Sequence, residues 1–115
     1  MILGNAAMID AMRAGTNGEN KPFPDGVKMA KIHWLIKKSP DAPSPTTVPD
    51  ILHDIDFMAR DSAKFAATGN WGYAQFNYDA PSDSFKPLGT GAACGYACHT
   101  LVKGKDYVFT AYPKR

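Results

Sequence analysis

The stretch Cys94-Gly95-Tyr96-Ala97-Cys98-His99 holds both cysteines of the chain and one of its three histidines. A Cys-X-X-Cys-His run attaches c-type haem, because its two thiols add to the porphyrin vinyl groups and the following imidazole binds the iron. Here the spacer has three residues instead of two. Because Cys98 and His99 are adjacent, one thioether still lies next to one axial ligand, and the motif predicts a haem site. The extra residue leaves the second thioether, from Cys94, open.

Other interpretations of these residues also remain open. Two cysteines four positions apart can form a small disulfide, or can stay unpaired and buried beside an ordinary polar histidine. A structural zinc site needs four nitrogen or sulfur ligands. His33 and His53 would then have to converge with the cysteines from distant parts of the chain, and the spacing gives no support for zinc.

Length and composition predict one soluble globular domain. The chain has 115 residues, of which 44% are hydrophobic and 21% are charged, and this suits a modest core rather than disorder. The net charge of +2 gives no case for nucleic acid or an acidic membrane surface. No apolar run approaches the roughly 20 residues that a membrane span requires. The first four residues lack a secretory signal. Because c-type haem is attached outside the bacterial cytoplasm, we expect that a leader has been removed or that the cysteines are not haem ligands.

The N-terminal part of the sequence predicts a helix, a turn and a strand. Residues 3–14 carry apolar side chains at helical spacing and end at Gly15, and residues 22–26 form a Pro-Asp-Gly turn. Residues 27–36 alternate like a half-buried strand. One face carries Val27, Met29, Lys31, His33 and Leu35, and the other, which looks more like core, carries Lys28, Ala30, Ile32, Trp34 and Ile36. Lys31 and His33 thus share a mixed face that could line a cavity or point to solvent.

The rest of the chain predicts further strands and loops. Residues 39–49 are a proline-rich loop, and 51–58 are an apolar run that reads as a strand or a turn leading into one. The run is interrupted by acids whose spacing does not fit a calcium loop, so Asp50, Asp54 and Asp56 are interpreted as a polar face. Residues 60–65 are predicted to form a short helical turn, and residues 71–78 are the clearest predicted strand. Residues 79–91 are predicted to form turns, and residues 107–112 a final strand.

Together these elements predict an α+β fold, in which a small antiparallel β-sheet packs with one or two short helices. The haem would lie near the C-terminal Cys-His motif. The sequence has no internal repeat and no sign of a second domain.

Three groups of residues also carry a family resemblance. They are Phe23-Pro24-Asp25-Gly26, then Asn70-Trp71-Gly72-Tyr73-Ala74-Gln75-Phe76, then Cys98-His99-Thr100 followed by Lys103 and Asp106-Tyr107-Val108-Phe109-Thr110. From the turn to the C-terminus the chain resembles the cytochrome P-460 family, which includes the beta-type cytochromes c-prime. The resemblance implies a c-type haem protein with a largely antiparallel sheet, commonly dimeric. It implies one haem-binding domain over residues 1–115, and an early strand and leader are expected to be missing upstream.

The resemblance assigns roles to single residues. It implies that Cys98 forms a thioether, that Cys94 forms the other, and that His99 is the proximal ligand of the iron of haem c. The other ring nitrogen of His99 should then be held by a hydrogen bond. One branch of the family has a lysine bonded to the porphyrin edge and oxidises hydroxylamine. Lys31 is the first candidate for that cross-link and Lys28 the second, although an exposed lysine without a special role is the alternative.

The function implied by the resemblance is that of a periplasmic mono-haem c-type cytochrome. Its five-coordinate iron would bind nitric oxide or a related small nitrogen species, with electron transfer to a redox partner protein. One alternative is a hydroxylamine-oxidising enzyme whose base is among His33, Asp54, Asp56 and Gln75. An apolar pocket lined by Phe57, Phe65 or Phe76 would favour gas binding instead. A further alternative is a haem-free structural or binding domain of the same fold. A homodimer is also expected, with residues 107–112 as one candidate interface, although these residues could equally belong to the core.

Overall fold

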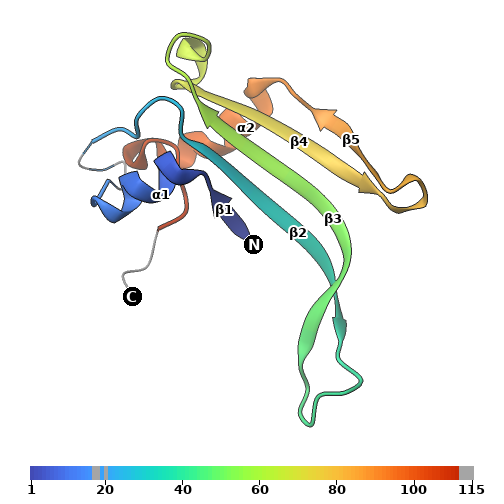
Figure 1. Ribbon diagram of the computed structural model, residues 1–115. Helices are drawn as coiled ribbons and strands as arrows, with labels where there is room; N and C mark the ends of the chain where they lie inside the picture. The colour runs from blue at the N-terminus through green and yellow to red at the C-terminus, as the bar shows by residue number, and fades with distance from the viewer. Residues whose placement is uncertain (17–18, 20, 112–115) are drawn as a thin grey trace.

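The computed structural model describes residues 1–16, 19 and 21–111, and these form an antiparallel sheet with short helices (Figure 1). The α+β prediction is confirmed. The elements are β1 (Ile2–Gly4), α1 (Ala6–Arg13), β2 (Lys28–Lys38), β3 (Thr47–Arg60), β4 (Trp71–Asp79), β5 (Ser84–Gly89) and α2 (Ala92–His99), with 3₁₀ turns at Ala66–Thr68, Ala80–Ser82 and Thr100–Lys105.

The five strands pair in sequence order, β1 to β5, and every pairing is antiparallel. Directly opposite residues share a face of the sheet. Met29, Met58 and Tyr73 therefore form one row across β2, β3 and β4, and Lys31, Asp56 and Gln75 form the next row on the same face. We call this the inner face, because the core and the helix α2 pack against it.

The core is small and lies at one end of the inner face. Its buried residues are Met8, Phe23, Val27, Met29, Trp71, Tyr73, Tyr107 and Val108. The amphipathic helix α1 contributes Met8, and the side chain of Asn5 caps the helix by accepting a hydrogen bond from the Met8 amide at 3.1 Å. The prediction that the face with Ala30 and Ile32 is the core side of β2 is wrong, because Val27 and Met29 on the opposite face are the buried residues.

Several predicted boundaries differ from the structure. Residues 3–14 divide into β1 and α1, and 60–65 end a strand and form a turn rather than a helix. The segment 79–91 contains β5 in addition to turns. No strand forms over residues 107–111. Tyr107 and Val108 enter the core instead, Phe109 stays exposed, and the predicted last residue, Tyr112, lies outside the described residues.

The far ends of β2 and β3 form a hairpin that projects beyond the rest of the sheet (Figure 1). A β-bulge precedes this hairpin, because His33 pairs with Asp54 whereas Trp34 pairs with Leu52. His53 is therefore the extra residue, and a bulge turns the side chains away from strict alternation. Beyond the bulge Ile36 and Ile51 are exposed.

Candidate functional site

The helix α2 presents both cysteines to one cavity. Cys94 and Cys98 are free, exposed thiols and both line a cavity of about 350 Å³ between α2 and strands β3 and β4. At 3.6 residues per turn, residues four apart are offset by only about 40° around the helix and about 6 Å along it. The three-residue spacer therefore keeps the two thiols on one face. The disulfide that the sequence left open does not form.

Gly95, inside the spacer, allows α2 to approach the sheet closely. A Cβ atom at this position would lie 2.4–2.6 Å from three side-chain atoms of Tyr73, namely its Cβ, Cγ and Cδ1. No larger residue fits without moving the helix or the ring. The glycine in the motif thus sets how near the cysteines and His99 lie to β4.

The ring of His99 has a fixed orientation. Its Nδ1 lies 2.6 Å from the carbonyl oxygen of Tyr107, and because a carbonyl can only accept, Nδ1 carries the hydrogen. Tyr73 and Phe109 flank the imidazole, with ring centroids at 5.1 and 5.0 Å. Within the described part of the chain Nε2 has no hydrogen-bond partner, so the neutral ring offers a free lone pair. The expected hydrogen bond to the other ring nitrogen is confirmed.

The Tyr107 carbonyl is held in place by a buried ion pair next to it. Arg60 donates to both carboxylate oxygens of Asp106 at 3.0 Å, and the amide of Phe23 donates to the same carboxylate at 2.8 Å. Asp106 and Tyr107 both have left-handed backbone angles, with φ of 49° and 64°. This bond network ties the sheet, the Phe23 loop and the C-terminal segment together behind His99.

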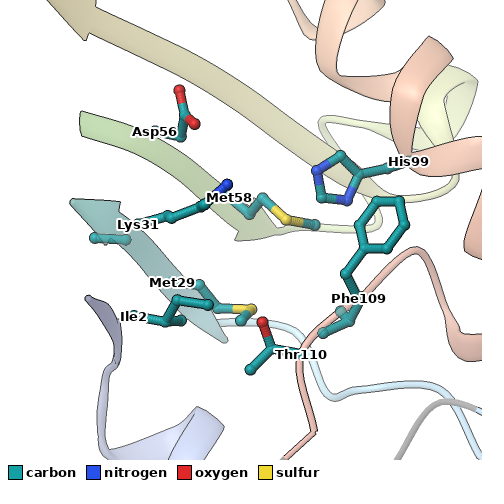
Figure 2. Close-up of a pocket in the computed structure, with 10 residues that line it drawn as sticks. Ile2, Met29, Lys31, Asp56, Met58, His99, Phe109 and Thr110 are labelled. Carbon is teal, nitrogen blue, oxygen red and sulfur yellow. The ribbon is translucent and has the colours of Figure 1, made fainter. Parts of the chain in front are cut away.

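A second cavity of about 250 Å³ adjoins the first (Figure 2). His99, Met58 and Asp56 line both cavities. The walls are mostly apolar, with Met29, Met58 and Phe109 among them, and Lys31 extends from β2 into this space. The larger of the two cavities falls within the range of roughly 300–1,000 Å³ that is typical of ligand pockets.

The structure separates the residues that the sequence proposed for this site. Lys31, Asp56 and Gln75 line the cavities, and so does Phe57. Lys28 lies opposite Ala59 on the outer face, away from the site. His33 and Asp54 lie one row farther along the inner face and line neither cavity, and Phe65 and Phe76 also line neither.

Tyr73 and Asp54 have shifted pKa values, as has Tyr107, whose pKa is raised by burial. Burial raises the pKa of Tyr73 strongly, and the neighbouring Tyr107 and Asp106 add to this, so its buried hydroxyl stays protonated. Burial alone would raise the pKa of Asp54, but hydrogen bonds from His33 and His53 outweigh it and lower this pKa below its ordinary value. Asp54 and Asp56 lie on one polar face of the sheet, opposite His33 and Lys31, although Asp54 is only 5% exposed.

Sequence reasoning missed the residues that position His99. Tyr73 and Phe109 were predicted as strand residues, and their contacts with the imidazole of His99 were not predicted. The supporting ion pair between Arg60 and Asp106 was not predicted either. The one local signal was Gly95, because a glycine inside a helical motif indicates a close approach.

Comparison with protein families shows the family to which this chain belongs. The family model described as cytochrome P460 matches residues 1–110, nearly the whole chain. The chain belongs to the cytochrome P460 family. Comparison with curated proteins gives no significant match. Membership in the cytochrome P460 family makes this a haem protein of the cytochrome class.

The residues present fit a haem group. A porphyrin needs a broad apolar cavity, and the two adjoining cavities share His99 with its free Nε2. Leu88 is 63% exposed at the wall of the larger cavity, and Phe109 is 55% exposed at the wall of the smaller one. A flat apolar group bound there would bury these side chains, which the protein itself leaves uncovered. No helix in the described ranges has the length and apolar character needed to cross a membrane.

Proposed function

We propose that this cytochrome P460-family protein is a periplasmic mono-haem c-type cytochrome that binds nitric oxide or a related small nitrogen species at an open iron position. The observation that carries the proposal is the state of His99. Its Nδ1–H donates a hydrogen bond to the Tyr107 carbonyl, and its Nε2 has no partner among the described residues and lies beside two adjoining cavities. This is the arrangement of a histidine that ligates a metal through one nitrogen and is oriented through the other.

Cys94 and Cys98 would hold the haem covalently. Each thiol adds its sulfur and its hydrogen across one vinyl group, so a thioether forms and nothing is lost. Both thiols are exposed and one helical turn apart on α2. This spacing supports two thioethers in spite of the longer spacer.

The bound haem would supply the redox and ligand-binding chemistry of its iron. The protein residues would control access and polarity on the cavity side. Met29, Met58 and Phe109 exclude water, and the row formed by Lys31, Asp56 and Gln75 offers one cationic and two hydrogen-bonding side chains. These groups can orient a small polar nitrogen species.

Oxidation of hydroxylamine is the second candidate function, and the position of Lys31 favours it. Of the two candidate lysines, only Lys31 lines the cavity that holds His99 (Figure 2). Asp56 lies opposite Lys31 on β3 and could accept a proton from the substrate. In this case the electrons would pass to a redox partner protein.

The proposal is tested by the intact mass of the chain after expression in a periplasm with active cytochrome maturation. Under denaturing, reducing conditions we expect the mass of the polypeptide plus one haem. Cys94→Ala and Cys98→Ala should each leave one thioether, and the double variant should leave none. A colourless wild-type protein with the bare polypeptide mass would contradict the proposal and support a haem-free domain.

The visible spectrum separates the two candidate functions. A lysine bonded to the porphyrin edge should broaden the haem absorption and shift it to the red. Lys31→Ala should then restore an ordinary c-type spectrum, and Lys28→Ala, on the outer face, should not. An ordinary wild-type spectrum, unchanged in Lys31→Ala and shifted when nitric oxide is added, would support the ligand-binding cytochrome.

A further inference from the structure

Beside the haem cavities, four potential metal ligands gather at the β-bulge. His33 on β2 pairs with Asp54 on β3, and the extra residue His53 lies next to Asp54. Asp56 belongs to the same face, one row nearer to the cavities. Ligand atoms of His33, Asp54 and Asp56 lie within 4.8 Å of one another.

Asp54 is the centre of this group. Nδ1 of His33 is in contact with one of its carboxylate oxygens and Nδ1 of His53 with the other. The residue is only 5% exposed. In the described part of the chain no lysine or arginine forms an ion pair with Asp54 or Asp56, although Lys31 lies opposite Asp56, and the two imidazoles are the contacts of the Asp54 carboxylate. A buried carboxylate with so little positive charge around it favours a bound cation.

The distances suit one ion shared by three residues. Zinc binds histidine nitrogen and carboxylate oxygen at about 2.0–2.2 Å, so two ligand atoms of one ion lie no more than about 4.3 Å apart. Nδ1 of His33 is 4.0 Å from Oδ2 of Asp56, which is within this limit, and it contacts Asp54 directly in a hydrogen bond that the ion would replace. An imidazole with two carboxylates is a ligand set for borderline divalent transition metals rather than for Mg²⁺, which prefers oxygen ligands in an octahedron.

We propose that His33, Asp54 and Asp56 bind one divalent transition-metal ion such as Zn²⁺ at the bulge, with His53 holding Asp54 in position. Three protein ligands leave a coordination place for water. His53 contacts the carboxylate oxygen of Asp54 opposite the one that faces His33, and such outer partners orient ligands. This site does not depend on the proposed haem function, although Asp56 lines the haem cavities as well.

The test is calorimetric titration of the full chain with Zn²⁺. The thiols of Cys94 and Cys98 are first blocked, by haem attachment or by alkylation, because free thiols beside His99 would bind zinc themselves. We expect one ion per chain in the micromolar range, undisturbed by millimolar Mg²⁺. The absence of saturable binding would overturn the proposal.

Substitutions locate the ion. Because His33 and Asp56 would bind the ion directly, His33→Ala and Asp56→Asn should each weaken zinc binding at least about tenfold. His53 would only orient Asp54, and His53→Ala should weaken zinc binding by about tenfold. The matched control is Asp50→Asn on the same strand, which removes the same charge at an ion pair with Lys37 and should change affinity less than about twofold. Equal weakening by Asp50→Asn and Asp56→Asn would mean diffuse attraction and would overturn the site.

A second readout guards against misfolded variants. Saturating Zn²⁺ should raise the Tm of the wild type and of Asp50→Asn, because the ion binds the folded state. It should leave the Tm of His33→Ala unchanged. Anomalous diffraction at the zinc edge should give a peak between His33, Asp54 and Asp56, and a peak elsewhere would refute the assignment.

Discussion

The orientation of His99 depends on residues far from it in sequence. The carbonyl that accepts its Nδ1–H belongs to Tyr107, and the preceding residue, Asp106, is bound to Arg60 and to the Phe23 amide. The side chains of Arg60 and Asp106 are 8% and 10% exposed. Removing one partner of such a pair leaves the other charge buried and uncompensated.

We therefore expect Asp106→Asn to lower the free energy of unfolding by about 3–5 kcal/mol, because the buried Arg60 then keeps only the more distant and half-exposed Asp25 as a counter-charge. Chemical denaturation followed by tryptophan fluorescence measures this, since Trp71 lies next to the Arg60 guanidinium. The control is Asp50→Asn, which breaks the exposed pair with Lys37 and should cost no more than about 1 kcal/mol. A similar loss in both variants would contradict the structural role of the buried pair.

For single residues, the sequence predicted the candidate haem-binding residues better than the residues that hold them in position. Cys94, Cys98 and His99 line the cavities, and so does Lys31, for which the alternation of β2 had left a cavity and solvent equally open. Arg60 and Asp106 are 46 positions apart, and no local pattern pairs residues at such a separation. The bulge at His53 was equally hidden, because alternation assumes an unbroken ladder.

Among the elements, α2 is the one whose place on the sheet matters most for the site. Gly95→Ala would put a Cβ 2.4–2.6 Å from atoms of Tyr73. The better helix propensity of alanine is worth up to about 1 kcal/mol, but the overlap should cost about 1–3 kcal/mol and move the helix. We expect a lower Tm and less haem bound per chain, measured by thermal unfolding and by absorbance.

The control for this substitution is Gly104→Ala, where an added Cβ has no neighbour within 4 Å. Its Tm should stay within a degree or two of the wild type, since exposed substitutions change stability by about 0.5 kcal/mol or less. If Gly95→Ala behaves like Gly104→Ala, α2 does not need its close contact with Tyr73.

The elements that the sequence mispredicted have physical explanations. β5 contains Pro87 and Gly89, which weaken a strand pattern but are tolerated on the edge of a sheet, where β5 lies. The predicted strand at 107–112 fails over the described residues because Tyr107 has a positive φ, and its ring packs in the core against Tyr96. Aromatic residues are common in buried segments as well as in strands, so a high aromatic content alone does not predict a strand. The backbone conformation is needed to tell the two kinds of segment apart.

For the whole molecule, the outer face of the sheet is the large apolar surface left open. It carries Ile32, Ile55, Phe57 and Phe76, and among the described residues Phe65 covers it only at one end, against Gly72. Phe57 is 41% exposed. A second copy of the chain would cover such a face, as the expected homodimer requires.

We expect light scattering to give twice the mass of one chain. Phe57→Lys should shift this to one chain, because a charge at the centre of the apolar face is costly to bury. Leu101→Lys, at a residue that is 84% exposed in the 3₁₀ turn after α2, is the control and should remain dimeric. A single-chain mass for the wild type would rule out this interface.

The strand order also bears on how the chain folds. Each strand pairs with the one next to it in sequence, and the ladder ends with β5 at Gly89. Pairings between neighbours close short loops and form quickly, whereas the bonds of Asp106 to Arg60 and Phe23 span 46 and 83 positions. The sheet can therefore assemble first and the C-terminal segment dock last. In that interval the two thiols and the imidazole of the motif stay accessible to the enzymes that would join haem to them.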